Sequence, residues 1–325
     1  MRKTLLSRMM PALVLLAIIV ALTPIIGGSP FWLDNSVLVA IFALLALSVG
    51  MAYGQAGILS MAPAAFGAIG AFATSIITVR YGLSPLVGLV LALILPMLLA
   101  YPMARAITRL SPLPLSIATL LLSLVLELAI REGGDFTGGY IGISGIPTLW
   151  FAESLFSMHV LSWLLVIGVI VLYANLTDSA IGRAVKTAQH DPLRATADGV
   201  NVPALLAVYF ALSASVAGLA GWLYAHHLTY MGPDSMTMHV SIRIVLMAVI
   251  GGASTFLGPV LGAAFLTLIT LYLPAAETQG MIFGAVLIFV LLVAPNGVLG
   301  TNWKKLLTPA AKRTERPAEA RGGVA

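Results

Sequence analysis

The sequence has little charge and no cysteine. Only 29 of its 325 residues are charged, which is 9%, against about 25% in soluble domains. From Met9 to Trp303 there are 18 charged residues among 295. So few polar side chains cannot cover a water-soluble globule, which excludes a soluble enzyme and a nucleic-acid-binding protein. The lack of cysteine excludes a disulfide framework, a thiolate nucleophile and a cysteine metal site.

What the sequence has instead is a series of apolar runs. We identify ten, each bounded by proline, glycine or charge, and a membrane-crossing helix needs about 20 mostly apolar residues. The runs cover roughly 10–26, 36–52, 58–79, 85–104, 113–130, 159–176, 202–225, 241–250, 259–273 and 281–294. The eighth is too short to cross alone unless it begins within 236–240. The sequence therefore predicts an all-α, polytopic inner-membrane helical bundle of about ten spans.

The positive charges predict its orientation. With the N-terminus inside, 14 Lys and Arg residues fall on the cytoplasmic side, and Arg80, Arg131 and Arg243 remain for the other side. This asymmetry is the usual topology signal and predicts that both termini are cytoplasmic. The first run could pass for a signal peptide, but it lacks a clean cleavage site, so we expect a retained helix. Residues 1–303 form the predicted transmembrane domain, and the basic tail 304–325 is expected to be disordered and to touch anionic lipid.

A second absence concerns nucleotide binding. The sequence has no G-x-x-x-x-G-K-[ST] motif, so the chain cannot hold ATP phosphates in a P-loop. If it moves a solute, the energy comes from a partner chain or an ion gradient. An ion-coupled carrier needs ionisable residues at the membrane midplane. The only ionisable candidates within the apolar runs are Glu127 and Arg243, and each lies about one turn from the end of its run and not at the midplane. This favours energy supplied by a partner chain over an ion gradient, and we expect no cofactor or metal ion in the chain itself.

The segment 53–71 does not look like a plain span. Gly54, Gly57 and Pro63 favour a broken or re-entrant segment near 54–66, which is tolerated at membrane depth only when it is buried in protein or lines a cavity. Gln55 and Ser60 would then line a polar path. A tightly packed helix without solute contact is the alternative, because Gly and Ala recur here at small-x-x-x-small spacing. A similar pattern at 251–263 suggests an internal repeat.

The glycine-rich outer loop 131–147 contains Gly142-Ile143-Ser144-Gly145. This matches G-x-S-G, the serine motif of intramembrane rhomboid-type proteases. Such chemistry also needs a histidine base within hydrogen-bond reach, for which the candidates are His226, His227 and His239. An intramembrane serine hydrolase using Ser144 is therefore the alternative function from a different class. A secondary carrier is the other.

The cytoplasmic loop 178–201 has the signals of a short capped helix. Asp191-Pro192 places a helix cap before a proline in the first turn, and Gly199 fits a C-terminal cap. Ala195 and Ala197 would keep such a helix slim enough to enter a groove on a partner. The loop is predicted to be a docking element, and a solvated linker is the alternative.

Taken in order, these segments resemble the membrane subunits of branched-chain amino-acid ABC importers, the LivM-like permeases. The resemblance extends from about Val37 to Gly300. It is carried by Gly54-Gln55, Ser60, Ala64 to Ala71, Thr137-Gly138-Gly139, Gly142, Ser144 to Pro147, Gly182-Arg183-Ala184, Asp191-Pro192, Ala197, Gly199-Val200-Asn201, Ser213-Ala214, Ala217 to Gly221, Gly251-Gly252, Gly258-Pro259 and Gly262-Ala263. Departures from the family pattern are Gln189-His190 and Asp198.

The resemblance implies a function, partners and site residues. It implies a permease subunit in the bacterial inner membrane that works with a homologous permease in a heterodimer, two ATP-binding subunits and a periplasmic substrate-binding protein. The path residues would be Gln55, Ser60, Pro63, Phe66, Thr137, Gly138 and Gly139. The ATPase-coupling residues would be Gly182, Arg183, Ala184, Asp191, Pro192, Ala195, Ala197 and Gly199. The low charge of the spans fits branched-chain or other small apolar amino acids, and leaves urea and short amides open.

Overall fold

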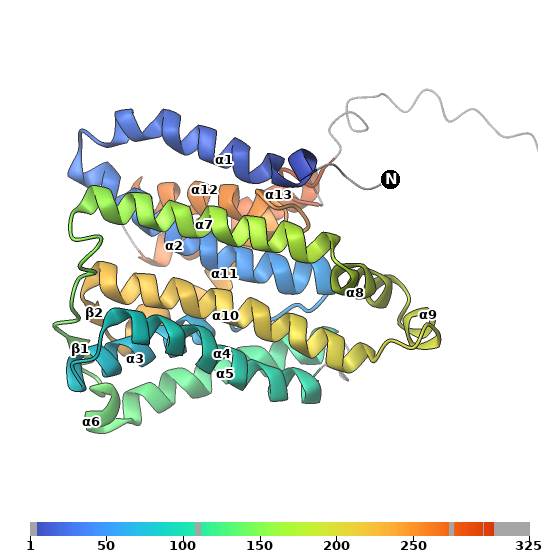
Figure 1. Ribbon diagram of the computed structural model, residues 1–325, viewed down its shortest axis with the longest axis horizontal. Coiled ribbons are helices and arrows are strands. Elements are labelled where there is room, and N and C mark those ends of the chain that lie inside the picture. The colour runs from blue at the N-terminus through green and yellow to red at the C-terminus, as the bar shows by residue number, and fades with distance from the viewer. Residues whose placement is uncertain (1–4, 108–111, 273–275, 295, 302–325) are drawn as a thin grey trace, which may run out of the picture.

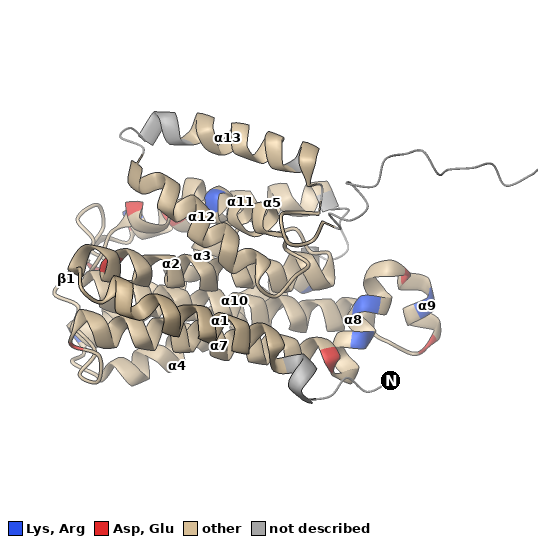
Figure 2. Ribbon diagram, turned by 90° about the horizontal axis from the view of Figure 1, so that it is seen from above, with Lys and Arg blue, Asp and Glu red and all other residues tan. Residues whose placement is uncertain are grey.

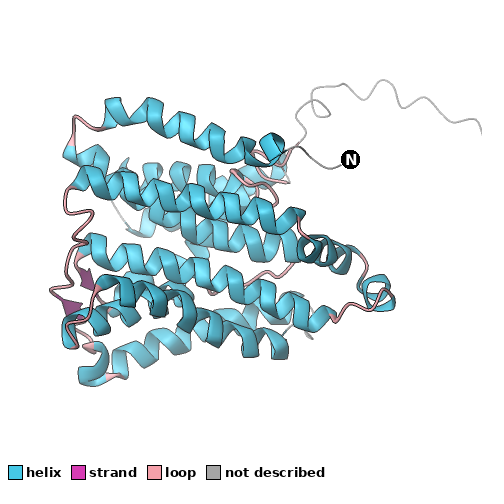
Figure 3. Ribbon diagram, viewed as in Figure 1, coloured by secondary structure: helices cyan, strands magenta, loops and turns pink. Residues whose placement is uncertain are grey.

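A computed structural model describes residues 5–107, 112–272, 276–294 and 296–301. Nearly all of them are helical, and the long helices run side by side with their connections at the two ends of the bundle (Figures 1 and 3). The α-helices are α1 (Leu5–Ile26), α2 (Pro30–Val49), α3 (Pro63–Arg80), α4 (Pro85–Ile107), α5 (Pro112–Glu132), α6 (Gly134–Thr137), α7 (Leu155–Asp178), α8 (Ala180–His190), α9 (Pro192–Ala197), α10 (Val202–Leu228), α11 (Met238–Gly251), α12 (Gly258–Tyr272) and α13 (Ala276–Val293). A π-helical turn, η1 (Gly50–Gln55), extends α2, and a 3-10 turn, η2 (Pro233–Met236), precedes α11.

The predicted all-α membrane fold is confirmed. Within the described residues, eight helical segments are long and apolar enough to cross a membrane, and the shorter apolar helices Gly258–Tyr272 and Gly280–Val290 fall at the ninth and tenth predicted runs. The eighth span differs from its predicted limits, because η2 and α11 together form the segment Pro233–Gly251. The sequence predicted that Arg243 lies one turn from the end of a span. In the structure it lies near the middle of the span.

Charged side chains are scarce along the length of the helices and gather toward the two ends of the bundle (Figure 2). The start of α1 and the segment α8–α9 lie at the same end, where α8 and α9 project beyond the bundle (Figure 1). The opposite end carries a two-stranded antiparallel sheet in which β1 (Ile143–Ser144) pairs with β2 (Tyr230–Met231). This arrangement leaves an apolar body between two polar ends, as a bilayer requires.

Small residues bring three central helices into backbone contact. A methyl group on Gly221 of α10 would come within 1.9 Å of the Gly67 carbonyl oxygen on α3. One on Gly70 would come within 2.3 Å of the Gly218 carbonyl oxygen, and one on Gly218 within 2.0 Å of the Ala92 carbonyl oxygen on α4. The small residues near 67–71 thus act as helix-packing residues, because apolar lipid supplies no hydrophobic force between helices and close van der Waals contact holds them.

Candidate translocation site and coupling segment

A break in the helical backbone separates the span Pro30–Gln55 from the span Pro63–Arg80, and we call the stretch between α2 and α3 the first interruption. The last turn of α2 widens into η1, and π-helical turns occur often at functional sites. Gly57 then adopts φ +69°, a left-handed conformation that side chains other than glycine rarely take. Helix α3 restarts at Pro63 in its first turn, where the missing N–H of proline costs nothing. Residues 57–62 therefore form a non-helical segment within the region 54–66, where the sequence predicted a break.

Hydroxyl groups of α5 satisfy the backbone of this segment. The Ser116 hydroxyl donates to the Leu59 carbonyl at 3.0 Å, and the Met61 N–H donates to Thr119 Oγ1 at 2.9 Å. The Ser123 hydroxyl donates to the Met61 carbonyl at 3.1 Å. Unpaired backbone groups cost several kcal/mol in lipid, so these side chains stabilise the non-helical connection between the spans Pro30–Gln55 and Pro63–Arg80.

The hydroxyls form a stripe that sequence reasoning missed. Ser116, Thr119 and Ser123 lie three and four residues apart, which places them on one face of a helix. Ser241 of α11 completes the set by accepting a hydrogen bond from the Ala64 N–H at 3.1 Å, at the start of α3. The signal was present in the sequence as hydroxyl residues at helical spacing within an apolar run.

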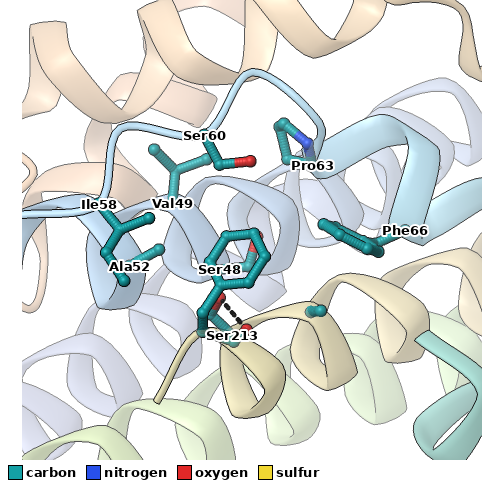
Figure 4. Close-up of a pocket in the computed structure, with 10 residues that line it drawn as sticks. Ser48, Val49, Ala52, Ile58, Ser60, Pro63, Phe66 and Ser213 are labelled. Atoms are coloured by element: carbon teal, nitrogen blue, oxygen red, sulfur yellow. Dashed lines mark hydrogen bonds between the residues drawn. The ribbon is translucent and has the colours of Figure 1, made fainter. Parts of the chain in front are cut away.

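A small internal cavity lies beside the interruption (Figure 4). Its lining comes from α2, η1, the non-helical segment, α3 and α10: Ser48, Val49, Ala52, Ile58, Ser60, Pro63, Phe66, Phe210, Ser213 and Ala214. The rings of Phe66 and Phe210 meet edge to face at 5.7 Å between centroids. The cavity volume is about 10 Å³, enough for about one water molecule. It is therefore closed to a solute as large as an amino acid.

The structure brings together only part of the predicted path. Ser60, Pro63 and Phe66 line this cavity. Gln55 is buried at the end of η1 and is not among the lining residues. Thr137 to Gly139 lie in and just after α6, where the Thr137 hydroxyl donates to the Ile130 carbonyl at 2.6 Å and Gly138 caps α6. These residues do not contribute to the cavity.

A second interruption separates α11 from α12 and meets the first. A methyl group on Gly54 would lie 1.9 Å from the Ala253 carbonyl oxygen, and one on Gly50 would lie 2.9 Å from Pro259. The two glycine-rich segments that share a pattern in the sequence thus touch each other through their backbones. The Tyr173 hydroxyl of α7 donates to the Gly50 carbonyl at 2.9 Å and ties the contact to a third helix.

The coupling segment is built from two short helices with capped ends. Ser179 accepts a hydrogen bond from the Gly182 N–H at 3.1 Å and begins α8. Asp191 accepts one from the Arg194 N–H at 3.0 Å and begins α9, as its position before Pro192 predicted. Side-chain caps of this kind stabilise a helix by about 1 kcal/mol each.

The predicted coupling residues divide into inward-facing and outward-facing groups. Gly182 and Ala195 are buried against this chain, whereas Arg183, Asp191, Pro192, Ala197 and Gly199 are exposed and Ala184 is half-buried. A methyl group on Gly182 would lie 2.2 Å from the Leu176 carbonyl oxygen, so the turn from α7 to α8 needs glycine. Leu193, which the sequence analysis did not select, has a side chain that is 84% exposed. Its only signal was a single large apolar residue in a polar loop.

One contact links α8 to the interruption. A methyl group on Gly57 would lie 3.2 Å from Cγ of Gln189, the residue before the end of α8. Gln189 also lines a cavity of about 270 Å³ with Tyr53 and Gly54 of the first interruption and Ala253 and Ser254 of the second, together with Val249 of α11 and Asn296 after α13. The end of α8 therefore lies against the break between α2 and α3.

The geometry gives no support to a serine hydrolase. Ser144 is exposed in β1. His226 uses both ring nitrogens elsewhere, with the Thr74 hydroxyl at 2.9 Å and the Pro147 carbonyl oxygen at 2.7 Å. Nε2 of His227 lies 3.0 Å from Oδ1 of Asp34. No histidine in the described part of the chain is hydrogen-bonded to Ser144, as a base for this chemistry would be.

The comparisons with known proteins agree with the resemblance. The chain is 25% identical to the high-affinity branched-chain amino acid transport system permease protein LivM of Salmonella typhimurium, over 82% of this chain and 69% of that protein. It is 24% identical to the probable branched-chain amino acid transport permease protein LivH of Methanocaldococcus jannaschii, over 86% and 95%. It is 30% identical to the autoinducer 2 import system permease protein LsrC of Escherichia coli, over 47% and 49%. The comparison with solved structures found no match.

The family model described as "Branched-chain amino acid transport system / permease component" matches residues 32–291, from the start of α2 into α13. The matched region contains both interruptions, the cavity and the coupling segment. The chain belongs to this family of transport permeases and is a multi-pass membrane protein.

Proposed function

We propose that this permease subunit imports branched-chain or other small apolar amino acids across the bacterial inner membrane. The observation that carries the proposal is the non-helical segment 57–62 between two spans of a chain of this family, where hydroxyls of α5 bond to the Leu59 carbonyl and to both backbone groups of Met61. Irregular backbone in a membrane is found where it is buried or lines a solute cavity. Transporters place discontinuous helices at their binding sites for this reason.

Energy and solute delivery are assigned to partner chains. Because the chain has no P-loop motif, we assign ATP hydrolysis to two separate subunits. A periplasmic binding protein delivers the solute, and a homologous permease completes the pair. Both termini lie in the cytoplasm, together with α8 and α9. The bundle agrees with this orientation, because the start of α1 and the coupling segment are at one end (Figure 1).

The path runs past the interruption. Ser60, Pro63 and Phe66 line it at the closed cavity, with Gln55 toward the cytoplasm and Thr137, Gly138 and Gly139 toward the outer side. A cavity that holds one water molecule describes a closed state. Passage of an amino acid therefore requires the cavity walls to separate.

Coupling passes through α8 and α9. Their outward-facing residues, Arg183, Asp191, Pro192, Leu193 and Ala197, dock on an ATP-binding subunit. Gly182, Ala184 and Ala195 pack inward and shape the element, and Gly199 follows α9 with a left-handed φ of +81°. The contact between Gln189 and Gly57 supports this assignment, because it places the docking element directly against the interruption.

Reconstitution tests the proposal. The chain would be purified with its neighbouring permease and ATP-binding subunits, placed in proteoliposomes and supplied with the binding protein. We expect uptake of leucine, isoleucine and valine that requires hydrolysable ATP and survives an uncoupler. Uptake that collapses with the uncoupler at constant ATP would instead indicate a secondary carrier. Transport of urea or of an unrelated solute such as autoinducer 2, without leucine, would refute the proposed substrate class.

A further inference from the structure

Arg243 is a charged residue near the middle of an apolar span. It is the eleventh residue of the 19-residue span Pro233–Gly251. Its Cζ atom lies 4.9 Å from the centre of the Phe42 ring, and Phe42 is the thirteenth residue of the 26-residue span Pro30–Gln55. The guanidinium therefore lies at the depth of the midpoint of α2 with η1. Elsewhere in the described spans the charged residues lie near span ends.

No acidic group of the described chain neutralises this charge. No described carboxylate lies within ion-pair distance of Arg243, and its Nε is buried without a hydrogen-bond partner. Glu127 is held elsewhere, by Arg131 at 2.9 Å and by the Met238 N–H at 3.2 Å. An unpaired charge at membrane depth is costly and marks a functional site by default.

Arg243 opens onto a cavity between α11 and α13. The cavity volume is about 450 Å³, within the range of small-molecule sites. Its lining is Arg243 with His239, Val240, Ile242, Leu246, Gly280 and Phe283. His239 is exposed, one helical turn from Arg243 toward the start of α11. The site therefore combines one deep cation with an apolar wall.

The depth of the Arg243 guanidinium in the bilayer determines which kind of anion can reach it. Phe42 lies about 18 Å along the helix from Pro30 at 1.5 Å per residue, and the hydrocarbon core is about 30 Å thick. Lipid phosphates lie outside that core, so they are out of reach of a guanidinium held beside Phe42. A carboxylate carried by a small solute can reach it, and a guanidinium binds a carboxylate through two parallel hydrogen bonds.

We infer that Arg243 binds the carboxylate of the transported amino acid, while Ile242, Leu246 and Phe283 contact its apolar side chain. The inference rests on the proposed function and narrows it, because it requires a free carboxylate and excludes urea and amides as solutes of this site. It also gives the chain a binding position separate from the closed cavity beside Ser60.

The test uses the complete importer with Arg243→Gln and Arg243→Lys. We expect Arg243→Gln to lower leucine uptake about tenfold or more, the loss typical of a hydrogen bond to a charged group. We also expect no change in how the binding protein docks: the solute-loaded binding protein should stimulate ATP hydrolysis half-maximally at the same concentration as in the wild type. Arg243→Lys keeps the positive charge but cannot form the two parallel hydrogen bonds of a guanidinium, so we expect it to retain part of the uptake. In thermal unfolding of the importer without binding protein, leucine stabilises the wild type and leucinamide does not, and Arg243→Gln removes the leucine effect.

Three results would overturn the inference. Full leucine uptake by Arg243→Gln would show that the cation does not bind the solute. Assembly of the permease pair only when residue 243 is charged would assign Arg243 to an acidic group of the partner. Glu277→Gln, which removes an acidic residue of α13 three positions before Gly280, serves as the control. If it reproduced the defect of Arg243→Gln, the arginine would belong to a structural pair. A wild-type importer that fails to take up leucine would refute the proposed function instead.

Discussion

The contact between the two interruptions predicts that Gly54 cannot be replaced even by alanine. The added methyl group would lie 1.9 Å from the Ala253 carbonyl oxygen, 2.6 Å from its carbon and 3.0 Å from the Ser254 nitrogen. All three are backbone atoms, so no side-chain rotation relieves the clash. The two segments would have to separate by more than about 1 Å to restore van der Waals distance.

Overpacking of this kind costs about 1–3 kcal/mol, and more where both partners are backbone. We therefore expect Gly54→Ala to lower the unfolding temperature of the purified importer by several degrees and to impair ATP-driven uptake. Gly168→Ala is the matched control, because a methyl group on Gly168 of α7 meets nothing within 4 Å and alanine favours the helix. Equal unfolding temperatures for Gly54→Ala and Gly168→Ala would refute the contact.

Further predictions concern the segments around this contact. Ser123→Ala removes the donor to the Met61 carbonyl and should cost about 0.6–1.7 kcal/mol, the range of membrane hydrogen bonds, measured as thermal stability and as solute leak without ATP. Leu193→Ala should weaken pull-down of the ATP-binding subunits about tenfold or more, because burying a leucine is worth about 1.5–3 kcal/mol. Ala197→Glu should uncouple ATP hydrolysis from uptake without loss of insertion, whereas Ala195→Glu, at a fully buried site, should also reduce the folded yield. Normal association and uptake in the exposed-site variants would identify the loop as a tether.

Composition and periodicity predicted most of the fold. Membrane spans are long and continuous in sequence, so ten apolar runs could be found from hydropathy alone. The exception was the span holding Arg243. Its first part, Pro233–Met236, contains Asp234 and reads as a polar turn. Its place in the bundle depends on Arg131, which pairs with Asp234 at 2.7 Å from a distant helix.

The sequence predicted only those parts of the site that depend on residues close together in the chain. Gly57 and Pro63 act on their own backbone, so the interruption was visible in the sequence. The hydroxyl stripe of α5 and the contact of Gly54 with Ala253 join segments far apart in the chain, and no local rule pairs them. Ala195 shows the same limit. A small residue in a capped helix suits either a groove on a partner or a contact within its own chain, and the structure buries Ala195 within the chain, outside the main hydrophobic cluster.

The contacts around the small cavity beside Ser60 indicate which segments must move for a solute to pass. On one side α3, α4 and α10 touch through their backbones at Gly70, Gly218 and Ala92, and such contacts cannot open without separating whole helices. On the other side residues 58–62 are held by three side-chain hydroxyls of α5. At about 0.6 kcal/mol each, these bonds together amount to roughly 2 kcal/mol, which corresponds to a minor state of a few per cent. If an ATP-binding subunit moves α8, as proposed above, the contact of Gln189 with Gly57 transmits that movement to the weakly held wall. We therefore expect the interruption to open the path while the three-helix block stays fixed.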